Sequence, residues 1–304
     1  MANDGEILIQ TEHLTKRFGK LVAVDELNLE IHRGEVFGFL GPNAAGKTTT
    51  IGMMVGLIKP TGGRVKIFGL DIKNNLPNIL PRVGVVMDYP AFYPYLSGRD
   101  NLRLLSRVTG GINDDRIEQV LEIVELASRA KDKYQTYSRG MKQRVGIACA
   151  LLHDPEFLIL DEPTSGLDPA GMKEIRDLIT RFGQEGKTIF LSSHLLHEVE
   201  QVCDHMAIIK QGKIIAQGGV TELLKRGAML QLQVTDPNRA MAILQETSWV
   251  SSVTREGDLL LVEAPSEHTT EISPLLAKND ISVSEMKTRE STLESFFLEV
   301  TAEE

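Results

Sequence analysis

The residue types best suited to chemistry stand in the run Gly41 to Thr49, directly behind the apolar segment Val36 to Leu40. The pattern Gly-x4-Gly-Lys-Thr, between a predicted strand and a predicted helix, is typical of a loop that wraps phosphate groups in backbone N–H donors. A side chain at either glycine would block the turn or the approach of the phosphate. Lys47 adds a positive charge for the phosphate oxygens, and Thr48 offers a hydroxyl to Mg²⁺. We expect the nucleotide-binding residues to be Gly41, Pro42, Asn43, Ala44, Ala45, Gly46, Lys47, Thr48 and Thr49.

Two acidic residues, Asp161 and Glu162, follow the apolar run Phe157 to Leu160, which is predicted to be a buried strand. Asp161 can hold Mg²⁺ opposite the Thr48 hydroxyl, and Glu162 can accept a proton from a water molecule that attacks a γ-phosphate. In isolation these acids would equally well open a turn. Behind a phosphate-binding loop, the metal and base roles are favoured. His194 ends the next predicted strand, so its imidazole can face the same phosphate, although a single histidine is more often structural.

A second anion site is predicted at the helix that begins at Ser138. The Ser138 side chain and the N–H groups around Gly140 form a helix N-terminus that attracts negative charge. One nucleotide already has its own loop at residues 41–49. We therefore expect the second site to close on the nucleotide of another molecule.

Two aromatic features stand outside these motifs. Phe18 lies in a polar turn and is either a core residue or a flat surface on which an adenine ring stacks. Residues 89–95 carry two prolines and several aromatic rings, a composition too stiff and apolar for a solvated loop, so the segment either folds inward or docks a partner. We favour docking, through Tyr89, Phe92, Tyr93 and Tyr95.

The elements that must position these residues alternate between strand and helix up to about residue 220. This alternation predicts a mostly parallel sheet with its ligands at the carboxyl ends of the strands. A helical subdomain is expected over about 89–155. After residue 220 the pattern becomes β-α-β-β-α-β, with a last helix over 292–300, which predicts a small α+β domain over 221–304 of the split βαβ, or ferredoxin-like, type.

Composition narrows the class of protein further. A chain of 304 residues with 42% apolar and 25% charged residues is an ordinary globular protein of two domains. No apolar run reaches the roughly 20 residues that span a bilayer, and the acidic N-terminus lacks a signal-peptide core, so we expect a soluble chain that stays where it is made. Net charge is −9, and residues 221–304 hold 15 acidic and 7 basic residues, which argues against a nucleic-acid partner. Cys149 and Cys203 fit core positions in a reducing compartment.

Taken together, the motifs resemble those of ATP-binding cassette (ABC) transporter ATPase subunits, over roughly residues 5–220. The motifs that occur in the order and spacing of that family are Gly41 to Thr49, Tyr137 to Met141, Leu160 to Pro163, Ser165 to Asp168, and His194. The resemblance implies an α/β fold of the P-loop NTPase type that binds ATP and Mg²⁺. It also implies that two such subunits pair with two ATP molecules between them, each ATP held by the phosphate loop of one subunit and the signature motif of the other.

The resemblance further implies a role for each motif. Phe18 would stack on adenine, Glu162 would be the general base, and His194 would contact the γ-phosphate. Asp168 would communicate across the dimer. The implied signature residues are Ser138, Arg139, Gly140 and Met141, and the implied metal ligands are Thr48, Asp161 and, more weakly, Asp88.

Four positions depart from the family pattern. Ala44 stands where the family usually has glycine, which is comfortable only if its φ is negative. Arg139 and Met141 replace the usual glycine and glutamine of the signature, a variant seen in exporter-type relatives. Asp88 replaces a glutamine that senses Mg²⁺ and the attacking water, and its side chain is shorter.

The C-terminal part, with its Ser291 to Phe297 segment, resembles the accessory region of drug, antibiotic and lipid exporter ATPases; the plain alternative for its role is an appendage that stabilises the dimer and binds no ligand. We therefore expect a peripheral ATPase subunit at the cytoplasmic side of the membrane. It would work as a homodimer and energise export through separate transmembrane permease subunits. The alternatives are an importer ATPase subunit with the same cassette, or a soluble ABC-type ATPase of DNA repair or translation. The latter usually carries a coiled-coil insert or two cassettes, and this sequence has neither.

Overall fold

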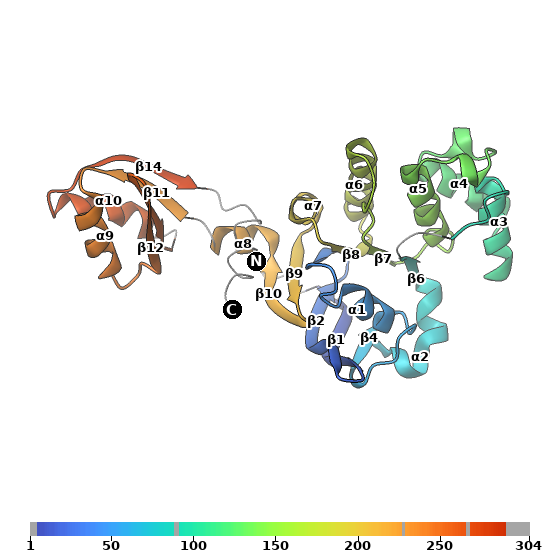
Figure 1. Ribbon diagram of the computed structural model, residues 1–304. Coiled ribbons are helices and arrows are strands. Elements are labelled where there is room, and N and C mark those ends of the chain that lie inside the picture. The colour runs from blue at the N-terminus through green and yellow to red at the C-terminus, as the bar shows by residue number, and fades with distance from the viewer. Residues whose placement is uncertain (1–4, 88–90, 227–228, 266–267, 290–304) are drawn as a thin grey trace. The chain divides into compact units, whose positions relative to one another are not determined.

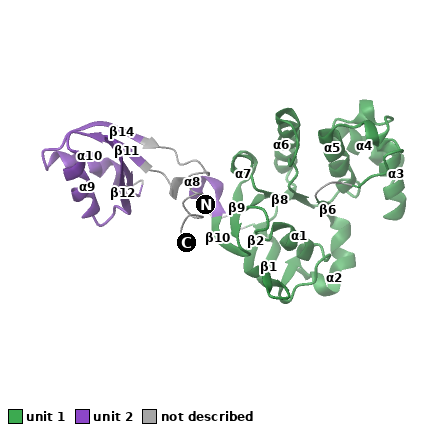
Figure 2. Ribbon diagram, viewed as in Figure 1, with its two compact units in different colours: residues 1–217 green, residues 218–304 purple. Residues whose placement is uncertain are grey.

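A computed structural model describes residues 5–87, 91–226, 229–265 and 268–289 (Figure 1). The chain divides into two compact units, residues 1–217 and 218–304 (Figure 2). Asp88, Tyr89 and the helix predicted over 292–300 lie outside the described residues.

The central sheet of the first unit has the strand order β10-β9-β3-β8-β7-β6. Its strands are β3 (Val36–Leu40), β6 (Val83–Val86), β7 (Phe157–Asp161), β8 (Thr188–Ser193), β9 (His205–Lys210) and β10 (Lys213–Gly219). Strand β3 pairs in parallel with β8 and β9, and β7 pairs in parallel with β6 and β8. Every residue of β3, β7 and β8 is buried, as expected for parallel strands covered on both faces. Because Leu40 pairs with Ser193 and Asp161 with Ser192, the three carboxyl ends meet at one edge.

Three helices follow these strand ends in the chain. They are α1 (Lys47–Met54) after β3, α6 (Pro169–Gln184) after β7, and α7 (Leu196–Val202) after β8. Helix α6 buries Ile175, Leu178, Ile179 and Phe182, which recur at helical spacing. Its start is fixed by the side chain of Asp168, which accepts a hydrogen bond from the Gly171 N–H, and by proline at the first helical position. The elements around the strand ends are therefore anchored by the core.

A second, antiparallel sheet of the first unit has the order β2-β1-β4-β5. Its strands are β1 (Ile7–Phe18), β2 (Leu21–His32), β4 (Gly62–Ile67) and β5 (Leu70–Asp71), followed by α2 (Ile72–Ile79) and a 3-10 turn (Leu80–Arg82). The sequence predicted one mostly parallel sheet and did not predict this separate one. The sequence signal for this antiparallel sheet is the alternation of apolar and polar residues in β2. Leu27, Leu29 and Ile31 are buried there, and the residues between them are exposed. This buried face joins Phe39 and Phe190 of the central sheet in one core.

The predicted helical subdomain is built from α3 (Gly98–Val108), α4 (Asp114–Ile123) and α5 (Arg139–Ala150), with short 3-10 turns at Ala127–Arg129 and Tyr134–Thr136. The three helices pack on one another. Each is capped at its N-terminus by a side-chain oxygen, from Ser97, Asn113 and Ser138 in turn. These caps fix where each helix begins.

The second unit has a core of its own. After α8 (Val220–Arg226) come β11 (Met229–Val234), α9 (Pro237–Gln245), β12 (Ser252–Glu256), β13 (Leu259–Glu263), α10 (Thr269–Ala277) and β14 (Val283–Arg289). The four strands form an antiparallel sheet in the order β12-β13-β11-β14. Leu232, Leu260 and Val262 of the sheet pack with Leu244 and Ile272 of the helices. The element order is the β-α-β-β-α-β order that the sequence indicates.

Two further findings bear on the class of protein. Within the described ranges, no helix is both long enough and apolar enough to cross a membrane. Burial raises the pKa of the Cys149 thiol to about 11 and raises that of Cys203 well above its usual value. Both cysteines are free thiols; Cys203 is buried, as predicted for a core position, whereas Cys149 is half-buried.

Candidate active site

The loop between β3 and α1 needs glycine at two positions because of its own packing. A Cβ added to Gly41 would lie 2.3 Å from the carbonyl oxygen of Ile209. Gly46 has a φ of +112°, and a Cβ there would lie 2.5 Å from the carbonyl oxygen of Ala23. Both positions therefore exclude side chains before any ligand is considered.

Ala44, in the same loop, adopts a left-handed backbone conformation with a φ of +64°. For a residue with a Cβ, this conformation is strained. The departure from glycine at this position is therefore the uncomfortable case that the sequence left open.

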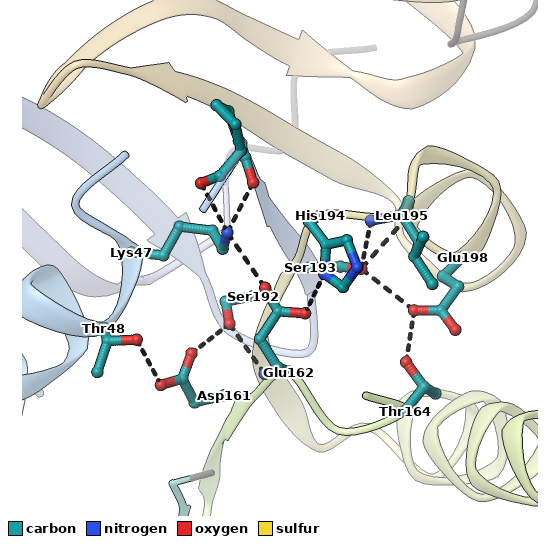
Figure 3. A network of polar contacts seen from close by, with 12 residues as sticks. Lys47, Thr48, Asp161, Glu162, Thr164, Ser192, Ser193, His194, Leu195 and Glu198 are labelled. Carbon is teal, nitrogen blue, oxygen red and sulfur yellow. Dashed lines mark hydrogen bonds and ion pairs between the residues drawn. The ribbon is translucent and has the colours of Figure 1, made fainter. Parts of the chain in front are cut away.

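The ammonium group of Lys47 is buried and fully engaged. It donates to the carbonyl oxygens of Gly41 at 2.6 Å and Pro42 at 3.1 Å. It also forms an ion pair with Glu162 at 3.1 Å, although only 6% of the Lys47 side chain is exposed. These contacts hold the charge at the centre of the loop (Figure 3).

Asp161, at the end of β7, links the loop to strand β8. The Thr48 hydroxyl donates to its Oδ2 at 2.9 Å, and the Ser192 hydroxyl donates to its Oδ1. A carboxylate and a hydroxyl that meet in this way are the hard oxygen donors that Mg²⁺ prefers. In the part of the chain that the structure describes, no cluster of three or more His, Cys, Asp or Glu side chains forms a metal cage. A pair of oxygen donors fits Mg²⁺ well, because this ion usually keeps several waters and binds substrate phosphates.

Glu162 and His194 come from neighbouring strand ends and touch each other. His194 Nδ1 lies 2.8 Å from Glu162 Oε2, and the Glu162 N–H donates to the Ser192 hydroxyl at 3.0 Å. Glu162 itself has a φ of +48°, another strained conformation. Figure 3 shows Lys47 and His194 on either side of the Glu162 carboxylate. The structure thus brings together the predicted base Glu162, the predicted phosphate contacts Lys47 and His194, and two predicted metal ligands, Thr48 and Asp161.

The four signature residues occupy the N-terminus of α5. The Ser138 hydroxyl accepts a hydrogen bond from the Met141 N–H at 3.2 Å. Arg139 donates to the carbonyl oxygen of Gly166, just before α6, at 3.0 Å. Figure 1 shows α5 grouped with α3 and α4 rather than with α1.

The two aromatic features differ in their burial. Phe18 is 49% exposed, with the Lys16 ammonium 4.8 Å from its ring centre, so the core alternative is wrong for this residue. Tyr93 and Tyr95 are 57% and 77% exposed. Phe92 is half-buried, with its ring 5.2 Å from that of Tyr134. The aromatic segment therefore folds one ring inward and presents two outward.

Sequence reasoning did not assign a role to Ser192 or to the cluster of Thr164, Ser193 and Glu198. The Ser192 hydroxyl bridges the main chain of Glu162 and the side chain of Asp161. The only signal for it was a hydroxyl at a strand end, and its partner depends on the register between β7 and β8. Glu198 lies in α7, whose range begins after His194, and no local pattern in the sequence indicates its contacts with Thr164 and Ser193.

Comparisons with known proteins agree on one family. A profile described as ABC transporter matches residues 24–165. The bacitracin transport ATP-binding protein BcrA of Bacillus licheniformis is 41% identical over 296 residues, which cover 96% of this chain and 97% of that protein. The linearmycin resistance ATP-binding protein LnrL of Bacillus subtilis is 36% identical over 305 residues, which cover 97% of this chain and 98% of that protein.

Solved structures match about 70% of this chain. The ATP-binding cassette MJ0796, in a dimeric post-hydrolysis state bound to ADP and Pi, matches with a TM-score of 0.64 and 26% identity, over 70% of this chain and 99% of that chain. The protein cbiO1 of Clostridium perfringens, part of an ABC transporter complex, matches with a TM-score of 0.65 and 29% identity, over 72% of this chain and 90% of that chain.

Proposed function

The chain belongs to the ATP-binding subunits of ABC transporters and is an ATPase, and from this premise we propose that it powers the export of an antibiotic-like compound through separate transmembrane subunits. The observation that carries the export role is the extent of the similarity to BcrA. It covers 96% of this chain, whereas the match to the solved cassette MJ0796 covers 70% of this chain. The similarity to BcrA therefore includes the second unit, which the sequence associates with exporters.

The loop from Gly41 to Thr49 binds the phosphates of ATP. Its N–H groups and the N-terminus of α1 attract the negative charge. The Lys47 ammonium group contacts the phosphate oxygens. To do so, the phosphates must compete with the Glu162 carboxylate, which pairs with the same ammonium group. Phe18 offers an exposed ring for the adenine base, which supports its stacking role.

Hydrolysis follows from the position of Glu162. A water oxygen attacks the γ-phosphorus, the bond from that phosphorus to the bridging oxygen breaks, and Glu162 accepts a proton from the water. ADP and phosphate leave. If His194 bridges Glu162 and a γ-phosphate oxygen, both of its ring nitrogens must donate, because both partners are anionic acceptors.

Thr48 and Asp161 are the proposed Mg²⁺ ligands, supported by the meeting of their oxygens at 2.9 Å. The ion, when bound, neutralises charge on the phosphates. Asp88 stays a third candidate from the sequence alone.

Subunits of this family dimerise, and we propose a homodimer in which Ser138, Arg139, Gly140 and Met141 contact the ATP held by the partner, while Asp168 links the two sites. Gly140 supports this arrangement. A Cβ there would lie 3.8 Å from its nearest neighbour, Gly171 Cα, which is an ordinary contact. The packing of the chain itself therefore does not require glycine, whereas a phosphate that approaches from a second subunit would.

ABC ATPase subunits also work with transmembrane permease partners. We propose that this chain binds them at the cytoplasmic face of the membrane, through the aromatic segment 89–95. Two tyrosine rings exposed in one short segment support this docking site, because aromatic residues are enriched at protein interfaces.

The test of the hydrolytic role is the change Glu162→Gln in the full-length chain. The variant keeps the shape of the side chain but is a far weaker base, so we expect ATP binding to persist, turnover to fall by about a hundredfold or more, and a closed dimer to accumulate with ATP. Turnover is measured by phosphate release and dimer formation by light scattering. Glu185→Gln, at an exposed site after α6, is the matched control.

Undiminished phosphate release by Glu162→Gln would reject Glu162 as the base. A variant that binds ATP, fails to hydrolyse it and stays monomeric would instead reject the proposed dimer.

A further inference from the structure

We propose that Glu198 is a positioning residue for ATP hydrolysis: its buried carboxylate ties together the two segments that carry Glu162 and His194. The inference rests on the proposed function, because it assigns Glu162 and His194 their roles there. Glu198 itself does not touch the reacting atoms. It acts through the residues next to them.

The contacts of Glu198 join the segment after β7 to the end of β8. Glu198 belongs to α7 and is 3% exposed. Its Oε2 accepts hydrogen bonds from the Thr164 hydroxyl at 2.6 Å and from the Ser193 hydroxyl at 3.1 Å. Thr164 lies two residues after Glu162, and Ser193 directly precedes His194. Figure 3 shows the three side chains gathered next to the Glu162 and His194 pair.

The same two segments are also joined directly, because His194 Nδ1 lies 2.8 Å from Glu162 Oε2. The Ser192 hydroxyl is a further link where the strands end, because it accepts from the Glu162 N–H and donates to Asp161. Glu198 holds the same segments at different points, through Thr164 and Ser193, and so restricts their turning about those links. The distance and angle between the proposed base and the proposed phosphate contact therefore depend on Glu198.

The backbone of Glu162 gives Glu198 a second effect. Its φ of +48° is strained, and such a conformation persists only where the surrounding structure holds it. The turn that follows is held by hydrogen bonds from Ser165 N to Glu162 O at 3.0 Å and from Leu167 N to Thr164 O at 3.2 Å. The bond from Thr164 to Glu198 anchors this turn to α7, which supports the strained conformation.

Only one of the two carboxylate oxygens carries these bonds. Oε1 is buried and accepts no hydrogen bond from any residue that the structure describes. A glutamine at this position could accept both hydroxyl donors through its own oxygen. An alanine could accept neither, and would leave the buried hydroxyls of Thr164 and Ser193 without this acceptor.

The experiment compares Glu198→Ala, Glu198→Gln and Thr164→Val in the full-length chain. For each variant we would measure kcat and KM for ATP, ATP affinity and thermal stability, with rates normalised to the nucleotide-binding fraction. We expect Glu198→Ala to lower kcat by about ten- to a hundredfold, the effect of a misplaced catalytic group, with ATP affinity changed less than about twofold. Glu198→Gln should recover most of kcat. Glu200→Gln, an exposed glutamate on the same helix, is the matched control.

Thr164→Val removes one of the two donors and keeps the shape of the side chain. It should lower kcat in the same direction, and the double variant Thr164→Val with Glu198→Ala should be no slower than Glu198→Ala alone, because both changes break the same link. A purely structural role would lower the melting temperature without changing kcat per folded subunit.

Unchanged kcat in folded Glu198→Ala overturns the proposal, and so does a Glu198→Gln variant as slow as the alanine variant. If Glu198→Ala does not fold, an unchanged kcat in Thr164→Val overturns it instead. These outcomes leave the proposed function intact, which fails only if the wild-type chain does not hydrolyse ATP or if Glu162→Gln remains active.

Discussion

Ala44 stands where the family usually has glycine, and its φ of +64° makes the alanine strained at this position. The methyl group of a left-handed alanine crowds the following carbonyl oxygen, which costs roughly 1–2 kcal/mol relative to a right-handed conformation. Glycine avoids this cost, but it also gains freedom in the unfolded chain.

The change Ala44→Gly should therefore stabilise the first unit by a net amount of about 0.5–1 kcal/mol. The measurement is urea unfolding of the full-length chain, followed by a signal from the first unit. Ala45→Gly is the control, since Ala45 is buried at 3% exposure and its φ is not among the positive values of the described residues. We expect that control to destabilise the unit, and a loss of stability in both variants would contradict strain at Ala44.

At the same scale, the sequence identified the residues that converge but not the bonds that join them. Asp161, Glu162 and His194 were predicted to meet because carboxyl ends of neighbouring parallel strands lie at one edge. The role of Ser192 depends on the pairing of Asp161 with Ser192 across β7 and β8. That register is set by long-range packing, which a local pattern does not contain.

At the scale of elements, the N-terminus of α5 holds a glycine, Gly140, that the packing of this chain does not require. Gly140 has room for a methyl group inside this chain. Glycine also lowers helix stability by about 1 kcal/mol relative to alanine.

We expect Gly140→Ala to leave the fold intact or slightly more stable and to leave ATP binding by the loop unchanged, but to abolish hydrolysis because the methyl group enters the space of the partner's phosphate. Circular dichroism, nucleotide titration and phosphate release measure the three properties. The control is Gly62→Ala in β4, where the atom nearest to the new methyl group, Thr15 Cβ, would be 3.5 Å away, and this variant should keep its activity. Normal hydrolysis by Gly140→Ala would argue against a signature contact in the dimer.

The end of α1 is set by a signal less obvious than the one that follows it in the sequence. Lys59 and Pro60 are a conspicuous helix stop, but the helix ends at Met54. Gly56 has a φ of +75°, and its N–H bonds back to the Met53 carbonyl oxygen. Glycine in this conformation is a common helix stop, so the signal was present one turn earlier.

At the scale of the whole molecule, two separate cores predict two separate unfolding events. Calorimetry of the full chain should resolve two transitions, since each unit buries its own apolar cluster. Because the proposed ATP site lies in the first unit, ATP should raise the transition temperature of that unit and leave the other unchanged. Lys47→Ala should remove that shift. A single transition, or a shift of both, would indicate that the units unfold as one.

Membrane association belongs to this scale as well. Tyr93 and Tyr95 are exposed, whereas Phe92 packs inside, so the paired change of Tyr93 and Tyr95 to serine removes surface without disturbing the core. We expect the variant to sediment with permease-containing membranes several-fold less than the wild type, on the scale of about 1–2 kcal/mol per lost aromatic anchor, and to keep the ATPase rate of the free subunit. Val108→Ser, at a site 76% exposed on α3, is the control. Equal sedimentation of all three proteins would remove the docking assignment.

The ion pair between Lys47 and Glu162 makes the base a rival of the nucleotide. Triphosphate must dislodge the glutamate before the ammonium group is free, so the observed affinity is weaker than the loop alone would provide. Glu162→Gln removes the rival charge, and that variant should hold ATP more tightly than the wild type in equilibrium dialysis. The Glu162 carboxylate is therefore paired with Lys47 until ATP binds, and the binding of ATP itself releases it.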